Sequence, residues 1–206
     1  MAHDRFRMFG RCLILAAGLI LLAPRGIAEA ATDPVSASRV LYSPDGYPQL
    51  TLPDGRRETI RSMLAITRQM HFGEFVWDEK SVPQGPVWVR VDLARQLLSV
   101  FRDGHEIGTA VILYGTDGKP TPTGSLKILE KNPRYYSRSY HAPMPFMLRL
   151  TNDGVAIHGS SVQEGRATHG CIGVPIDFAR LLFGAAKKGD LVAVLPAQEP
   201  QADRVK

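Results

Sequence analysis

Residues 158–171 read His158-Gly159-Ser160-Ser161-Val162-Gln163-Glu164-Gly165-Arg166-Ala167-Thr168-His169-Gly170-Cys171, and the rest of the chain is organised around them. This stretch holds two of the six histidines and the only cysteine outside the apolar N-terminal segment. Because one loop's length of chain separates them, these side chains can meet in the folded protein. The pattern predicts a nucleophilic cysteine, Cys171, with a histidine as its base.

The chemistry explains why these residue types belong together. A free thiol has a pKa of about 8.5, so a reactive cysteine needs a nearby imidazole or positive dipole, and His158 and His169 are both available. Gly170 lets the backbone turn tightly and leaves the N–H groups of Gly170 and Cys171 uncovered. Donors of this kind stabilise an oxyanion by roughly 2.7 to 4 kcal/mol each. The alternative is that Cys171 is only a small buried hydrophobe.

The order of residues in this stretch also resembles the signature of a known protein family. Ile157-His158-Gly159, followed by Thr168-His169-Gly170-Cys171-Ile172, resembles the signature of the L,D-transpeptidase catalytic domain (YkuD-type). The resemblance covers about residues 86–196 and includes the turn Thr121-Pro122-Thr123-Gly124. It implies a mainly β fold with some α: sheets in a β-sandwich or barrel-like arrangement, with a few flanking helices.

The resemblance also implies roles for individual residues. Cys171 would attack an amide carbonyl, His158 would be the base with its tautomer fixed by the carbonyl of Gly159, and His169 and Gly170 would shape the oxyanion site. A second possibility for His169 is that it only holds the loop. The residues expected to contact substrate or support the loop are Thr168, Gly159, Tyr140, Met144 and Arg166. For Tyr140 and Met144, an ordered surface loop with inward-packed aromatics is the alternative.

The chain departs from the family pattern in two places. Gly173 stands where many members have an arginine or asparagine that helps to hold substrate. The loop between His158 and Thr168 is also shorter than is usual in the family. Neither departure removes a reacting group, so they bear on the identity of the substrate.

The N-terminus predicts export. Arg5, Arg7 and Arg11 precede an apolar run over residues 13–23, and Ala28-Glu29-Ala30 offers a cleavage site, so residues 1–30 are interpreted as a signal peptide cleaved near Ala30. An uncleaved anchor is the alternative, although the run is shorter than the ~20 residues of a spanning helix. The expected location is the periplasm or cell envelope. Residues 31–85 would form an N-terminal extension with one helix, 86–196 the catalytic domain and 197–206 a flexible tail.

Several elements are predicted from periodicity and turn signals. Apolar residues at Ile60, Met63 and Leu64 predict a helix over 56–70. Alternation predicts strands over 87–92, 96–101 and 106–113, with Asp103-Gly104 as a hairpin turn, and further strands over 125–129, 146–150, 155–158 and 191–195. Residues 132–145 are interpreted as a long loop or flap, and 177–187 as a helix.

Composition limits the function further. The net charge of +5 is mild and no basic run is interleaved with aromatics, so we expect no nucleic-acid partner. No Cys-x-x-Cys or His-x-x-x-His spacing occurs, so we expect no metal. The resemblance implies a monomer that acts on peptidoglycan stem peptides without a cofactor. Three hypotheses remain: an L,D-transpeptidase, a carboxypeptidase or endopeptidase that hydrolyses the same bond, and a binding protein without activity.

Overall fold

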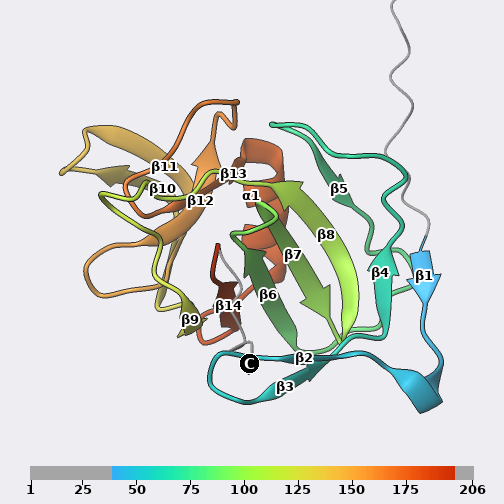
Figure 1. Ribbon diagram of the computed structural model, residues 1–206. Coiled ribbons are helices and arrows are strands. Elements are labelled where there is room, and N and C mark those ends of the chain that lie inside the picture. The colour runs from blue at the N-terminus through green and yellow to red at the C-terminus, as the bar shows by residue number, and fades with distance from the viewer. Residues whose placement is uncertain (1–38, 198–206) are drawn as a thin grey trace, which may run out of the picture. The chain divides into compact units, whose positions relative to one another are not determined.

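The computed structural model describes residues 39–197 (Figure 1). The predicted signal peptide, its cleavage near Ala30, and the tail beyond Ala197 lie outside the described residues. Among the described residues no helix is long and apolar enough to cross a membrane. The described part is mainly β with one α-helix, and its sheets do not close into a barrel, which confirms the predicted fold class.

The larger sheet is built on the predicted run of antiparallel hairpins. Strands β6 (Val87–Asp92), β7 (Leu97–Arg102) and β8 (His105–Val111) pair in sequence. Asp103 and Gly104 both have positive φ, 47° and 77°, as a two-residue turn matched to the twist of the strands requires. The alternating pattern of the sequence therefore predicted this part of the fold correctly.

The sheet continues on both sides of this hairpin pair in the order β1-β4-β8-β7-β6-β14-β9, and β5 also pairs with β8. Strand β14 runs parallel to β6, and β9 is antiparallel to β14 at one edge. A separate two-stranded sheet joins β2 to β3. The bounds of these strands are β1 Arg39–Leu41, β2 Gln49–Thr51, β3 Arg57–Thr59, β4 Ser62–Leu64, β5 Phe75–Trp77, β9 Gly124–Lys127 and β14 Leu191–Leu195.

The smaller sheet positions residues 158–171, because β12 contains the start of this stretch and β13 begins directly after its end. Its four strands follow chain order: β10 (Glu130–Ser137), β11 (Ala142–Arg149), β12 (Ala156–Ser160) and β13 (Ile172–Pro175). Strands β12 and β13 are parallel neighbours, with His158 opposite Gly173. The loop between them contains residues 161–171, so pairing of these strands returns Cys171 to the neighbourhood of His158.

One helix, α1 (Ile176–Ala185), lies between the smaller sheet and β8 (Figure 1). It matches the helix predicted over 177–187, and it buries Phe178, Ala179 and Leu182 in a core shared with both sheets. Phe178 also meets the ring of Trp77 on β5, with centroids 5.5 Å apart. Strand β5, which precedes residue 86, is therefore packed into the same core as the predicted catalytic domain.

The prediction of a helix over residues 56–70 is wrong. These residues form β3 and β4 instead, and β4 pairs with β1 and β8. The buried positions are Ile60, Ser62 and Leu64, which alternate with period two. The polar Ser62 concealed this pattern in the sequence; its hydroxyl is bonded to His105 at 2.9 Å, a partner that only the fold supplies.

The long loop predicted over residues 132–145 is also wrong, since most of it belongs to the hairpin of β10 and β11. These strands pair from Glu130 opposite Arg149 to Ser137 opposite Ala142. Pro143 and Pro145 argued against a strand because proline donates no ladder hydrogen bond. Strand β11 pairs with β12 only at its far end, however, so its proline-bearing half has one free edge that tolerates them.

Candidate active site

Cys171 lies immediately before β13, where two pockets meet. The first, here the His158 pocket, has a volume of about 140 Å³ and a mostly apolar lining. The second, here the Asp153 pocket, has a volume of about 360 Å³. The His158 pocket is lined by Ser137, Tyr140, Ala142, Pro143, Met144, His158, Thr168, His169 and Cys171. The Asp153 pocket is lined by Gly118, Lys119, Pro120, Tyr140, Asp153, Gly154, Val155, His169, Gly170 and Cys171.

The imidazole of His158 is held in one orientation. Its Nδ1 is 2.9 Å from the carbonyl oxygen of Gly159, and since a carbonyl only accepts, Nδ1 carries the proton. The lone pair is then on Nε2, the form a general base requires. Burial lowers the pKa of His158 below its ordinary value, and the bond to Gly159 opposes this shift only in part. The imidazole is therefore neutral at neutral pH.

The thiol of Cys171 is half-buried, and at neutral pH it is protonated. Burial raises its pKa, a backbone hydrogen bond from Ala156 opposes the rise, and the carboxylate of Asp153 adds to it. The Sγ atom contacts the carbonyl oxygen of Gly154 at 3.9 Å. The pair at rest is thus a neutral thiol and a neutral imidazole on the wall of one pocket, and a proton must move before the sulfur becomes a nucleophile.

The backbone on both sides of Cys171 is fixed by two threonines. The hydroxyl of Thr168 donates to the carbonyl of Cys171, so its side chain supports the loop through the backbone. The hydroxyl of Thr121 donates to the carbonyl of Gly170 at 3.0 Å. Gly170 has φ of +106°, a conformation that favours glycine, so the tight turn expected before the cysteine is present.

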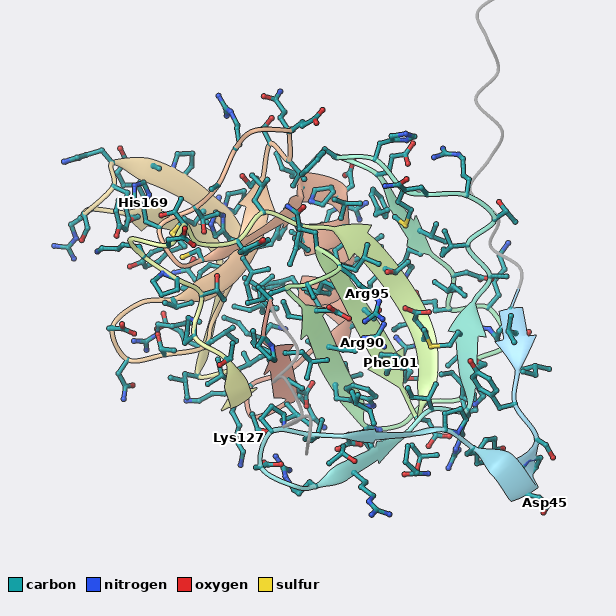
Figure 2. The ribbon with its side chains drawn as sticks, in the orientation of Figure 1. Asp45, Arg90, Arg95, Phe101, Lys127 and His169 are labelled. Atoms are coloured by element: carbon teal, nitrogen blue, oxygen red, sulfur yellow. The ribbon has the colours of Figure 1, made fainter. Side chains whose placement is uncertain are left out.

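A stacked pair of rings separates the two pockets. The rings of Tyr140 and His169 are 4.7 Å apart with an angle of 18° between their planes, and Lys119 Nζ donates to the tyrosine hydroxyl at 3.2 Å. Tyr140 comes from the turn between β10 and β11, and His169 lies beside this hairpin (Figure 2). The expected groove residue Met144 is buried on β11 and lines the His158 pocket.

The structure brings together most, but not all, of the residues predicted from the sequence. Gly159 lies behind His158, where a Cβ atom would come within 3.1 Å of Pro145. Arg166 lies elsewhere, beside Asp117 in a hollow of about 320 Å³ that excludes Cys171. Sequence reasoning missed Lys119 and Asp153, because neither residue is itself part of a motif, although Lys119 stands two residues before the turn Thr121-Pro122-Thr123-Gly124.

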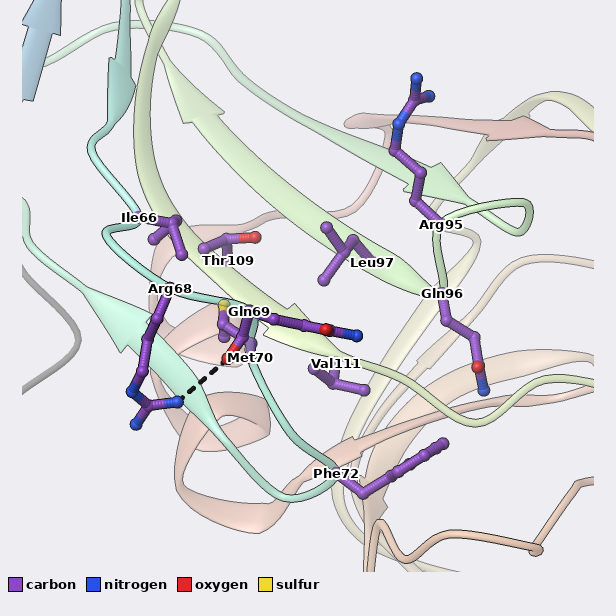
Figure 3. Close-up of a pocket in the computed structure, with 10 residues that line it drawn as sticks. All are labelled: Ile66, Arg68, Gln69, Met70, Phe72, Arg95, Gln96, Leu97, Thr109 and Val111. Carbon is purple, nitrogen blue, oxygen red and sulfur yellow. Dashed lines mark hydrogen bonds between the residues drawn. The ribbon is translucent and has the colours of Figure 1, made fainter. Parts of the chain in front are cut away.

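A further hollow of about 290 Å³ lies away from Cys171, between residues 66–72 and the strands β7 and β8 (Figure 3). Apolar side chains including Met70, Phe72 and Val111 line it, with Arg68 and Arg95 at its rim. The guanidinium of Arg68 donates to the backbone carbonyl of Gln69 at 3.1 Å. None of the residues predicted for the site lines this hollow.

Comparison with known proteins agrees with this fold. Residues 86–194 match the family model described as the L,D-transpeptidase catalytic domain, which is more than half of the chain. The protein therefore belongs to the L,D-transpeptidase catalytic domain (YkuD) family, as the motif predicted. A search of curated protein sequences gave no match.

Similar solved structures include an L,D-transpeptidase from Stackebrandtia nassauensis, 26% identical, with a TM-score of 0.51 over 57% of this chain and 62% of that one. The L,D-transpeptidase of Enterococcus faecium is also 26% identical, with a TM-score of 0.50 over 54% and 50% of the two chains. A third, solved in complex with imipenem, is 24% identical with a TM-score of 0.50 over 53% and 58%, which shows the shared fold alone. This chain thus spans less than two thirds of each of these neighbours.

Proposed function

We propose that this protein is a cysteine-dependent L,D-transpeptidase that acts on peptidoglycan stem peptides, forming cross-links or exchanging the terminal residue. The observation that carries the proposal is that two pockets meet at one thiol, that of Cys171. A transpeptidase must hold a donor amide and an acceptor amine at a single nucleophile, one after the other. Membership of the family supports the same reaction.

In the first half of the reaction, Cys171 Sγ attacks the carbonyl carbon of the donor amide and its proton passes to Nε2 of His158. The N–H groups of Gly170 and Cys171 stabilise the oxyanion. When this intermediate collapses, the C–N bond breaks and the leaving amine takes the proton from His158. A thioester remains on Cys171.

In the second half, an acceptor amine attacks the thioester carbon and gives a proton to His158. The C–S bond breaks, a new amide forms, and the sulfur regains its proton from the imidazole. Since the bond energy of the donor amide is kept in the thioester, the proposed reaction needs neither a nucleotide nor another cofactor.

The test is incubation of the protein with purified tetrapeptide muropeptides, followed by mass analysis of the products. We expect cross-linked dimers with the unchanged protein and none with Cys171→Ala. Tripeptide and free terminal residue without dimers would establish the hydrolase instead. If the unchanged protein forms neither dimers nor tripeptide, both the transpeptidase and the hydrolase activity are contradicted.

The covalent intermediate can be trapped separately. A carbapenem such as imipenem carries a strained amide, and opening it by Cys171 leaves a stable acyl group on the sulfur. Intact-mass measurement should show one imipenem adduct on the unchanged protein and none on Cys171→Ala. Absence of the adduct from the unmodified protein would argue strongly against a thioester mechanism.

We further propose that the protein works as a monomer in the periplasm or cell envelope, after cleavage near Ala30. The basic residues and apolar run at the N-terminus support export. N-terminal sequencing of the protein from an envelope fraction should begin at Ala31. Recovery of the intact N-terminus from that fraction would contradict cleavage.

A further inference from the structure

The carbonyl of Gly170 is held by a side chain from a distant part of the sequence. Thr121 is buried, with 5% of its surface exposed, and its hydroxyl donates to this carbonyl at 3.0 Å. The same hydroxyl accepts the N–H of Gly115 at 2.9 Å. Both hydrogen-bonding roles of the hydroxyl are thus used, and its proton is directed at Gly170.

The turn that carries Thr121 is fixed against the cysteine loop by close backbone packing. A Cβ atom at Gly115 would lie 2.1 Å from the carbonyl oxygen of Lys119 and 2.9 Å from the Cα of Gly170. The N–H of Thr168 donates to the carbonyl of Tyr114 at 2.9 Å, next to this contact. The turn therefore has little freedom to slide along the loop, and Thr121 is a rigid anchor.

The geometry of the peptide bond transmits this anchoring to the nucleophile. In a trans peptide the C=O and N–H groups lie in one plane and point in opposite directions. Fixing the carbonyl of Gly170 therefore fixes the direction of the N–H of Cys171. The constraint is needed because glycine at φ of +106° has no side chain that limits rotation of this peptide.

We infer that Thr121 is a positioning residue for catalysis: its hydroxyl holds the Gly170–Cys171 peptide so that the N–H of Cys171 points at the oxyanion. The inference rests on the proposed function and names a determinant of its acylation step. Without the hydrogen bond from Thr121, the Gly170–Cys171 peptide can rotate, and the N–H of Cys171 then no longer points at the oxyanion. A residue that only packs the turn would affect folding and not this step.

The test separates a reaction that forms an oxyanion from one that does not. Acylation by imipenem passes through a tetrahedral oxyanion, whereas alkylation of Cys171 by iodoacetamide is a displacement that needs only the thiolate. We expect Thr121→Val to slow acylation by about tenfold or more, with the alkylation rate changed by less than about twofold. Thr121→Ser, which keeps the hydroxyl, should restore most of the acylation rate.

Thr109→Val is the matched control, because Thr109 is equally buried, with 3% exposed, but lies on β8 away from both pockets. Its acylation rate should equal that of the unchanged protein. If Thr121→Val does not fold, the pair Thr121→Ser and Thr121→Ala isolates the hydroxyl in the same way.

Three results would overturn the inference. Acylation of Thr121→Val at the unchanged rate, or equal slowing of acylation and alkylation, shows that Thr121 does not orient the oxyanion donor. Failure of the unchanged protein to react with imipenem while its thiol is alkylated overturns the proposed function, and this inference with it. The first two results leave the proposed function intact.

Discussion

The ring of Tyr140 stacks on the imidazole of His169, with centroids 4.7 Å apart and an angle of 18° between the planes. Both rings line both pockets at Cys171, so the stack forms the wall between them. Lys119 adds a hydrogen bond to the tyrosine hydroxyl from the other side of the wall. The hairpin of β10 and β11 is thereby connected to the cysteine loop through side chains.

Tyr140→Ala should therefore weaken substrate binding and leave the reactivity of the thiol intact. An aromatic pair contributes about 0.5 to 1.5 kcal/mol, so we expect kcat/KM to fall by about two- to tenfold, mainly through KM. Steady-state kinetics on the muropeptide, with iodoacetamide alkylation of Cys171 alongside, would measure both quantities. The control is Tyr136→Ala, on the same hairpin but 53% exposed and outside both pockets. Equal losses in the two variants would mean that the stack has no specific role.

His158 should be required for chemistry because it is neutral, half-buried and presents Nε2. Its orientation depends on the 2.9 Å contact with the carbonyl of Gly159. Replacing it by glutamine should slow imipenem acylation by about a hundredfold or more, as loss of a general base does. His169→Gln, at an exposed ring of the same pocket, should cost much less. The reverse order would assign the base to His169.

The pH dependence of the thiol follows from the raised pKa of Cys171. A thiol whose pKa is raised keeps its proton to a higher pH, so the thiolate fraction at neutral pH lies below that of a free cysteine. Alkylation by iodoacetamide, followed on the Cys171 peptide by mass, should rise with pH through an inflection above that of an ordinary cysteine. The protein unfolded in urea should give the ordinary inflection. An inflection below that of the unfolded protein would show an ion pair at rest.

Asp153 contributes to this shift, after burial and in the same direction. Asp153→Asn removes the negative charge near the sulfur, so the inflection should move to lower pH while remaining above that of the unfolded protein. Asp177→Asn, an acidic residue on α1 outside both pockets, is the matched control and should leave the inflection in place. An inflection in Asp153→Asn at the same or a higher pH would show that the charge of Asp153 does not raise the pKa of Cys171.

Local sequence predicted the elements whose pattern is complete within a short window. The hairpins around Asp103-Gly104 and the helix at Phe178 depend on turn chemistry and on one buried face, and both were placed correctly. The histidine and cysteine of the site were found because their motif lies in one stretch. Elements whose burial depends on distant partners were missed. Ser62 is buried because Arg39 and His105 bond its hydroxyl, and no window of the sequence contains all three.

The same limit applies to the site. Lys119 and Thr121 reach the surroundings of Cys171 from one connection, between β8 and β9, and Asp153 reaches them from another, between β11 and β12, so their proximity depends on the way the two sheets pack. Thr121 lay within a recognised turn, but its bond to Gly170 spans 49 positions in the sequence. Arg166, in contrast, is close to Cys171 in sequence and lines another hollow. Distance along the chain was thus a poor guide to the substrate-contacting residues.

Gly173, at the position where the resemblance leads us to expect an arginine or asparagine, lies opposite His158 in the strand pair and close to Ser160. A Cβ atom at Gly173 would lie 3.1 Å from the Cβ and 3.4 Å from the Oγ of Ser160. The residue cannot move away, because its N–H and C=O both bond Leu113, at 2.9 and 2.8 Å. Gly173→Ala should therefore lower the free energy of unfolding by about 1 to 3 kcal/mol, as overpacking does.

Ser160→Gly removes the group that the new methyl would meet, at a cost of roughly 0.5 to 1 kcal/mol for a glycine within a strand. The double variant should consequently be more stable than the sum of the two single changes implies, and urea unfolding of all four proteins measures the coupling. Additive effects would show that the crowding at Ser160 is relieved elsewhere. If the coupling is present, an arginine at position 173 needs a smaller residue at 160 before its side chain can reach a substrate. The absence of an arginine at position 173 then follows from the close packing of β12 and β13. Substitution of Gly173 alone should therefore not place an arginine side chain where it can reach a substrate.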